Sequence, residues 1–296
     1  MAYAAGTKQQ LIDIHVHGAK THDTGTRRQD DILRIAEIHG QHGIGAIVPT
    51  VYPGPVETMR ENMAAIRGAM ASQRNGAAIL GVHLEGPFLN AAYAGSLDKK
   101  HCQDPSPKTL KSLIDGFEDI IRIITIAPEL PGALQAIESC RKKAFLVQMG
   151  HSDATYEQAE EGKNAGATGI THLFNAMRGF HHREPGLAGF GLMDDDLYVE
   201  VIADLAHLHP QSLKMVLDMK SPDRIILVSD SVKGAGWGKG AIRGPGGVLQ
   251  GSGISLADCV MNLVSLGVSQ EMALRFASEN PKRYLGMETS ERIRML

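Results

Sequence analysis

Six side chains that can bind a metal ion or carry a proton follow apolar segments spread along the chain. They are His15, His17, Glu85, His151, His172 and Asp230. Neutral imidazoles and carboxylates are the usual ligands of zinc and other first-row divalent ions. An ion with one open position lowers the pKa of a bound water toward about 7, which supplies hydroxide at neutral pH. The residue types therefore predict a metal centre suited to hydrolysis.

His15 and His17 lie two residues apart in the apolar segment 11–18. Successive side chains of a strand point to opposite faces, so we expect both histidines on one face, opposite Ile14 and Val16. A histidine pair that repeats on one face of an apolar strand is difficult to explain by packing alone. The pattern favours two ligands of one site.

His151 and His172 each close a short apolar run, and a helical segment, residues 155–166, lies between them. Two parallel strands joined by a helix place both histidines at the carboxyl ends of the strands. A single histidine at a strand end is more often a hydrogen-bonded core or rim residue. The joint occurrence with the other candidates favours a metal site, because burying so many polar groups without partners is costly.

Apolar strand-like and helix-like segments alternate along most of the chain. The expected strands are residues 11–18, 44–50, 78–85, 121–127, 144–147, 169–171, 198–204 and 224–230. The expected helices are residues 27–42, 56–70, 107–117, 131–141, 155–166 and 210–219, and, after the glycine-rich segment 234–253, residues 256–266 and 270–280. Eight such repeats predict a (β/α)8 barrel. The rival, a doubly wound sheet, lacks a GxGxxG motif after the first strand. We expect one domain over residues 1–296, with its site at the carboxyl ends of the strands.

Composition narrows the class of protein. A net charge of −3 gives no basic footprint for nucleic acid or an acidic membrane surface. Cys102, Cys140 and Cys259 form no CxxC pair, which favours reduced thiols. The first ten residues contain no apolar signal core, and no apolar run approaches the about 18 residues of a membrane span. These features predict a soluble cytoplasmic protein.

Several longer motifs surround the candidate ligands. They are HLEGPFLN at residues 83–90, GHS at 150–152, THLFNAM at 171–177, HREPGLAG at 182–189 and SD at 229–230. In order and spacing, from Leu11 to Met287, the chain resembles the N-acetylglucosamine-6-phosphate deacetylases of the amidohydrolase superfamily. The resemblance implies a metal-dependent barrel enzyme that removes the acetyl group from N-acetylglucosamine 6-phosphate.

The resemblance also implies roles for the six candidates. Glu85, His151 and His172 would bind the main metal ion. His15 and His17 would complete a second position, with Glu85 bridging the two. Asp230 would take a proton from the metal-bound water and hand it to the departing amine. Zinc is the expected ion, with iron, manganese or cobalt as alternatives.

Substrate contacts carry over at four further positions. Asn175, Ala176 (through its main-chain N–H), Arg183 and His207 match residues that hold the sugar phosphate and hydroxyls. A guanidinium fork suits a phosphate. In the family this arginine can reach across a dimer interface, so a homodimer is expected.

Two features depart from the family pattern. Members carry a small β-sandwich built from segments at both ends of the chain, and here only ten residues precede Leu11 and nine follow Met287, so a bare barrel is expected. Leu97 stands where members often carry a histidine that polarises the acetyl carbonyl. Alternatives are therefore an amidohydrolase acting on another N-acyl sugar, a cyclic amide or a deaminase substrate, or an inactive barrel serving as a binding subunit. Trp237, after Asp230, would line the pocket or pack beneath its loop.

Overall fold

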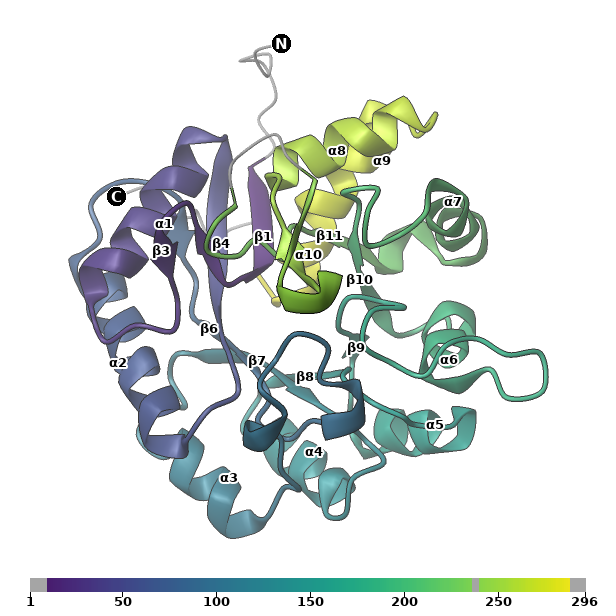
Figure 1. Ribbon diagram of the computed structural model, residues 1–296, viewed down its shortest axis with the longest axis horizontal. Helices are drawn as coiled ribbons and strands as arrows, with labels where there is room; N and C mark the ends of the chain where they lie inside the picture. Colours follow the sequence, from purple (N-terminus) through teal and green to yellow (C-terminus); the bar gives the residue numbers. More distant parts are fainter. Residues whose placement is uncertain (1–9, 236–239, 288–296) are drawn as a thin grey trace.

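The computed structural model describes residues 10–235 and 240–287, so Trp237 lies outside the described residues. Its main sheet is a parallel barrel in which each strand pairs with the next along the chain (Figure 1). The strands, in order, are β1 (Leu11–Val16), β4 (Ile44–Val51), β6 (Val82–Glu85), β7 (Ile121–Ile126), β8 (Leu146–Met149), β9 (Gly169–Ile170), β10 (Tyr198–Ile202) and β11 (Ile225–Val228). The residues just after β11 return to β1, where Val16 and Ser231 form a parallel bridge. The predicted (β/α)8 class is confirmed.

Helices surround the strands on the outside of the barrel (Figure 1). They are α1 (Gln29–Gln41), α2 (Val56–Ser72), α3 (Pro107–Ile114), α4 (Ala133–Lys142), α5 (Tyr156–Ala165), α6 (Gly186–Met193), α7 (Pro210–Met219), α8 (Leu256–Ser265), α9 (Gln270–Ala277) and α10 (Glu279–Tyr284). A large apolar core lies between helices and strands. A smaller cluster, which includes Ile12, Ile14 and Val228, fills the barrel interior. This double core holds the strand ends in fixed positions.

The alternation expected along the first strand is broken. The pairing of β1 with β4 shifts register between Asp13 and Val16. As a result Ile14 packs with the interior cluster, whereas Val16 packs with the outer core. Strict period-two geometry predicted that Ile14 and Val16 share a face, and the structure places them on different faces.

Other differences lie at glycines and loops. The strand expected over residues 78–85 consists of two pieces, β5 (Ala78–Ile79) and β6, because Gly81 adopts φ +144° and a Cβ there would lie 2.4 Å from the carbonyl oxygen of Ile120. The helix expected over 270–280 divides into α9 and α10 at Ser278.

Helix α6 and two hairpins were not expected. The hairpins pair β2 (Gly18–Ala19) with β3 (His22–Asp23), and β12 (Ala241–Arg243) with β13 (Leu249–Ser252).

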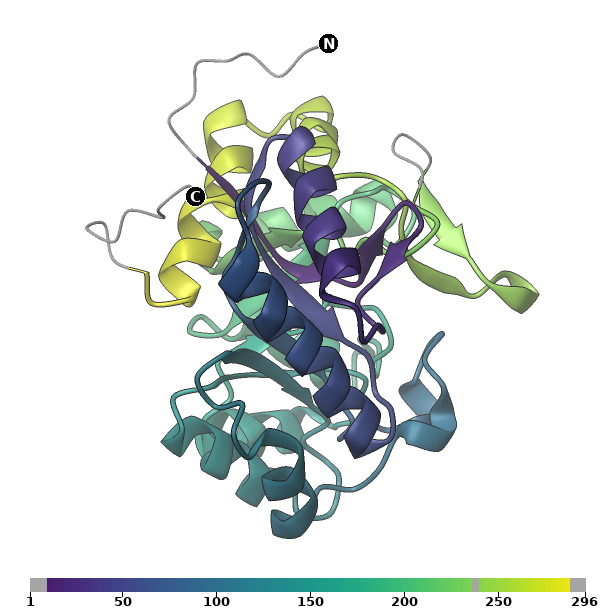
Figure 2. The ribbon, with the colours of Figure 1, turned by 90° about the vertical axis from the view of Figure 1, so that its left-hand side faces the viewer.

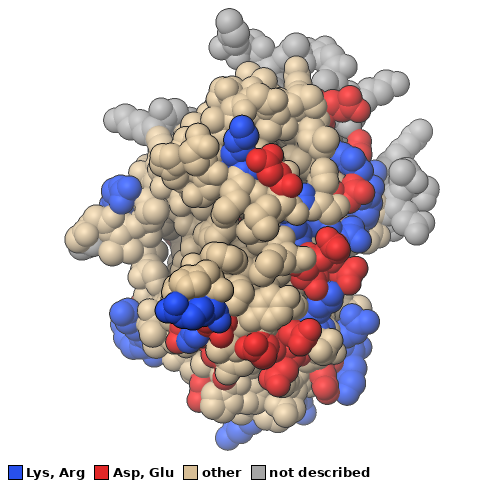
Figure 3. All heavy atoms as spheres, turned by 90° about the vertical axis from the view of Figure 1, so that its right-hand side faces the viewer, with Lys and Arg blue, Asp and Glu red and all other residues tan. Residues whose placement is uncertain are grey.

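The β12–β13 hairpin and the segment with the short helices η1 (Ala91–Tyr93) and η2 (Lys99–His101) project from the same side of the barrel (Figure 2). Within residues 10–235 and 240–287, the only sheets besides the barrel are the two hairpins, and no helix is long and apolar enough to cross a bilayer. On the face drawn in Figure 3, basic and acidic side chains are interspersed rather than gathered into one basic patch.

Candidate active site

Of the six predicted side chains, the four histidines meet around the carboxylate of a fifth, Glu85. Its Oε1 lies 3.1 Å from His151 Nε2 and 3.2 Å from His172 Nε2. Its Oε2 lies 3.1 Å from His17 Nε2, and Oε1 lies 3.3 Å from His15 Nε2. All five side chains are buried. One carboxylate thus contacts both histidine pairs, with His15, His151 and His172 at Oε1 and His17 at Oε2.

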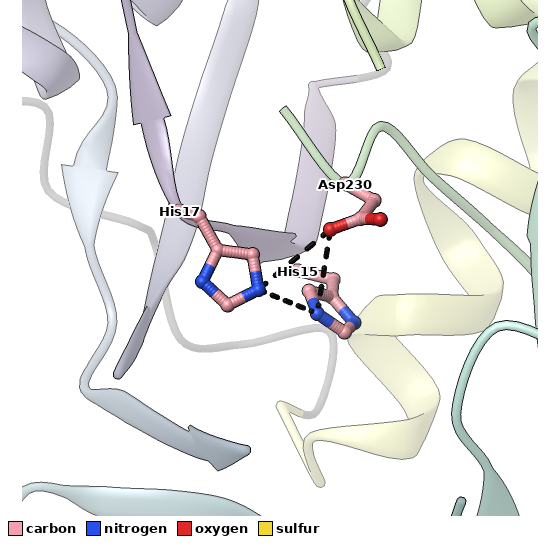
Figure 4. Close-up of side chains that lie close together, drawn as sticks. All are labelled: His15, His17 and Asp230. Carbon is pink, nitrogen blue, oxygen red and sulfur yellow. Dashed lines mark hydrogen bonds and ion pairs between the residues drawn. The ribbon is translucent and has the colours of Figure 1, made fainter. Parts of the chain in front are cut away.

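Asp230 follows β11, the last barrel strand, and lies beside His15 and His17 of the first strand (Figure 4). The two Nε2 atoms of the histidines lie 3.2 Å apart, and Asp230 Oδ1 lies 3.6 Å from His15 and 3.7 Å from His17. The main chain fixes this approach, because the N–H of Asp230 donates to the carbonyl of His15 at 3.1 Å. Barrel closure therefore brings the first and last strands of the site together.

Three of the side chains sit at strained turns that follow their strands. His151, His172 and Asp230 have φ values of +48°, +28° and +49°. Residues with a Cβ rarely adopt this left-handed region, and such conformations concentrate at functional sites. Just beyond His151, the side chains of Thr155 and Gln158 form a capping box that starts α5. The turn that presents His151 is thus held between a strand and a capped helix.

Hydrogen bonds at the outer ring nitrogens indicate which ring nitrogen donates in three of the four histidines, His15, His151 and His172. Nδ1 of His15 lies 2.9 Å from a carboxylate oxygen of Glu200, and Nδ1 of His151 lies 2.9 Å from the carbonyl of Tyr93. Nδ1 of His172 lies 3.2 Å from the carbonyl of Asn175. Carbonyl and carboxylate oxygens only accept, so each Nδ1 donates, and in the neutral form of each ring Nε2 presents a lone pair for a metal ion.

These Nε2 atoms fit a divalent cation. Nε2 of His151 and Nε2 of His172 lie 3.1 Å apart beside the Glu85 carboxylate, an arrangement of ligand atoms that suits a divalent cation. Burial raises the pKa of Glu85, but the neighbouring His17 and His151 outweigh it and hold that pKa well below its usual range. The carboxylate is therefore ionised and able to bind metal.

A cavity of about 320 Å³ opens over this cluster. Its lining residues come from the cluster, from the segments after β4, β6, β9 and β10, and from the β12–β13 hairpin: His17, Tyr52, Glu85, Gly95, Ser96, Leu97, His151, His172, Asn175, Ala176, His207, Asp230, Arg243, Gly247, Val248, Leu249 and Gln250. Three of the four predicted substrate contacts, Asn175, Ala176 and His207, are among them. Leu97 is too, so the position without a carbonyl-polarising histidine faces the same space.

The sequence comparison agrees with this geometry. The amidohydrolase family model matches residues 11–294. The chain belongs to the amidohydrolase family. The sequence-based recognition of this enzyme class is confirmed.

Within this family, the chain is similar to deacetylases of phosphorylated amino sugars. The N-acetylgalactosamine-6-phosphate deacetylase of Escherichia coli O157:H7 is 33% identical over 292 residues, covering 94% of this chain and 77% of that protein. The N-acetylglucosamine-6-phosphate deacetylase of Vibrio furnissii is 32% identical over 293 residues, covering 94% and 73%. Among solved structures, the N-acetyl-D-glucosamine-6-phosphate deacetylase of Mycobacterium smegmatis has 30% identity and a TM-score of 0.86, covering 94% of this chain and 78% of that one. A mutant of that enzyme, solved in complex with N-acetyl-D-glucosamine-6-phosphate, has a TM-score of 0.87 at 29% identity, covering 94% and 77%.

Arg183 is the one predicted substrate contact that lies apart from the cavity of this amidohydrolase chain. It is exposed, and its Nη1 lies 2.9 Å from Nε2 of the neighbouring His182. It is absent from the cavity lining among the described residues. Within one chain, therefore, the fold does not bring Arg183 to the other substrate candidates.

His207 faces the cavity with its Nδ1 held by Asp204 Oδ2 at 2.8 Å. Main-chain N–H groups of Ala206 and His207 donate to the other oxygen of the same carboxylate. Burial lowers the pKa of His207, but the bond to Asp204 outweighs it and the pKa is raised. The contact with Asp204 therefore makes the ring easier to protonate than a free imidazole, and a protonated ring suits an anionic ligand.

Glu200 is a buried carboxylate of the site that sequence reasoning missed. Its Oε2 accepts from His15 Nδ1, and its Oε1 accepts from Gln148 Nε2 at 2.9 Å. Burial raises the pKa of Glu200, but His15 outweighs it, so the pKa is lowered and the group is ionised. The available signal was an acidic residue inside the apolar run Tyr198–Ile202. His83 lies nearby, but its nitrogens contact Thr125 Oγ1 at 2.9 Å and the Ile14 carbonyl at 3.2 Å.

Glu200→Gln should weaken metal binding. The substitution removes the charge that fixes the tautomer of His15, and changes of this kind typically cost about 10–100-fold in metal affinity. Equilibrium dialysis with elemental analysis would measure ions per chain against free zinc. Glu138→Gln, an exposed position on α4, is the matched control. Affinity equal to that of the wild type would show that Glu200 does not orient His15.

Proposed function

We propose that the chain hydrolyses N-acetylglucosamine 6-phosphate to glucosamine 6-phosphate and acetate. The observation that carries the proposal is the Glu85-centred cluster, which opens into a cavity lined by Asp230, Asn175 and His207. The relatives named for this reaction, and the related structure solved with this compound, support the choice of substrate.

In this proposal Glu85, His151 and His172 hold one divalent ion, and His15 and His17 hold a second with Glu85 shared between them. Zinc is proposed first, since imidazole and carboxylate donors suit it. When bound, such an ion supplies a water of lowered pKa and polarises the acyl carbonyl.

Asp230 is the proposed proton carrier. Its carboxylate lies at the rim of the cluster and lines the cavity, so it reaches both the ion-binding nitrogens and a substrate. It accepts a proton from the attacking water and then donates that proton to the nitrogen of the departing amine. The acyl C–N bond breaks as the amine leaves, and acetate remains.

The polar lining residues bind the sugar phosphate in this proposal. Asn175 Nδ2 donates to the carbonyls of His172 and Leu173, both at 3.3 Å, which ties the loop to a candidate metal ligand. Ala176 would offer its main-chain N–H, and His207 its protonated ring. Leu97 offers no donor, and loss of one such donor can cost about 10²-fold in rate. We therefore expect slower turnover than in relatives that carry a histidine there.

The proposal includes a homodimer in the cytoplasm. Because Arg183 lies outside the cavity of its own chain, it could bind phosphate only in the cavity of a second subunit. Phe180, in the same loop, is 52% exposed and would be covered in such a dimer.

The C4 epimer, N-acetylgalactosamine 6-phosphate, is the second candidate substrate, because the E. coli relative is named for it. Acetate release by the metal-loaded chain should be measured with both epimers and with unphosphorylated N-acetylglucosamine. Release from one phosphorylated epimer supports a deacetylase and identifies the sugar. No release from any of them would overturn the proposal, and would favour another N-acyl sugar, a cyclic amide or a deaminase substrate, or a non-catalytic binding role.

A further inference from the structure

The cavity contains a cation that neither the motifs nor the resemblance indicated. Arg243, at the end of β12, lines the same space as Glu85 and Asp230. It is the only lysine or arginine among the described residues of the lining. A phosphate dianion bound in this cavity therefore lies near one permanent positive charge, that of Arg243, from the chain that forms the cavity.

The hairpin that carries Arg243 is tied to the catalytic end of the barrel. β13 joins the segment after β11 through a parallel bridge between Ser231 and Ser252. The N–H of Ser252 donates to the carbonyl of Asp230 at 2.8 Å. Across the hairpin, Arg243 pairs with Leu249, and its Nη1 donates to the carbonyl of Gly247 at 2.8 Å. The guanidinium is thus held at the rim with other N–H groups left to bind a ligand.

Arg243 and His207 are both lining residues of the cavity that can carry a positive charge. The positive charge of Arg243 partly opposes the rise in the pKa of His207 that Asp204 produces. A phosphate dianion bound in the cavity is attracted by the positive charge of Arg243 and by that of a protonated His207. A guanidinium fork and a protonated imidazole on the walls of one cavity are suitable donors for phosphate oxygens.

We propose that Arg243 binds the phosphate of the substrate from the same chain that supplies the metal ligands, together with His207. This inference rests on the proposed function, since it assigns the phosphate of the proposed substrate to one wall of the cavity. It makes Arg243 a specificity-determining residue that favours phosphorylated over unphosphorylated sugars.

Titration of inorganic phosphate into the metal-loaded full chain tests this without requiring turnover. Arg243→Ala should weaken phosphate binding by about tenfold or more, the effect of losing a charge-assisted hydrogen bond, and Arg243→Lys should recover part of it. Lys233→Ala, which removes an exposed charge near the hairpin but outside the cavity lining, is the matched control and should bind as the wild type does.

Kinetics provide the second readout. Arg243→Ala should raise KM for the phosphorylated substrate by a similar factor, so that the ratio of kcat/KM for the phosphorylated sugar to that for the unphosphorylated sugar falls. Wild-type phosphate affinity in Arg243→Ala, with loss of binding in Arg183→Ala, would overturn the proposal and assign the phosphate to a partner subunit. If the wild type binds phosphate but releases no acetate, the proposed function fails while the test of Arg243 stands.

Discussion

Asp230→Asn should lower kcat by about 10²–10⁴-fold, the range associated with general acid–base catalysis, while the bound metal stays unchanged. The amide has nearly the same shape as the carboxylate but cannot take the proton from water. Asp230 lies 3.6 and 3.7 Å from the two histidine nitrogens, farther than Glu85 lies from any of its four, so the ion-binding set remains complete.

Acetate release and elemental analysis should be measured on the same sample of the Asp230→Asn variant. Asp195→Asn, at an exposed position, is the matched control and should behave as the wild type does. An Asp230→Asn protein that keeps its metal and turns over within a few fold of the wild type would refute the proton-carrying role.

Glu85→Gln should have the largest effect on metal content, because this one carboxylate faces both histidine pairs. Its two oxygens contact His17 on one side and His151 and His172 on the other. Without this charge, both proposed ion positions have only neutral imidazoles and an amide as ligands. We expect metal affinity to fall by more than the about 10–100-fold typical of a residue behind the ligands, such as Glu200.

Elemental analysis across a zinc titration would measure this fall, with circular dichroism to verify that Glu85→Gln remains folded. Glu138→Gln again serves as the control. A folded Glu85→Gln chain that holds as many ions as the wild type, at the same free zinc concentration, would exclude Glu85 as the shared ligand.

The sequence predicted the barrel and the positions of the clustered side chains for one physical reason. His151, His172 and Asp230 directly follow apolar strands, and the carboxyl ends of parallel strands in a barrel meet at one rim. Local sequence order was therefore enough to predict that residues far apart in the chain, such as His17 and Asp230, would lie together.

Glu200 and Arg243 could not be predicted in the same way. Glu200 lies within a strand, and only the closed barrel places it against the outer nitrogen of His15. Arg243 lies in a glycine-rich segment, and it reaches the cavity because Ser252 pairs with Ser231. The broken strand before Glu85 likewise depends on a tertiary contact, the close approach of Gly81 to Ile120.

Metal-dependent deacetylation is tested most directly by acetate release from N-acetylglucosamine 6-phosphate, measured as a function of zinc ions bound per chain. We expect no release from the metal-free protein and a rate that rises as ions bind, restored by adding zinc after chelation. A chain that binds one or two ions and releases no acetate at any loading, or that is equally active without metal, would contradict this expectation.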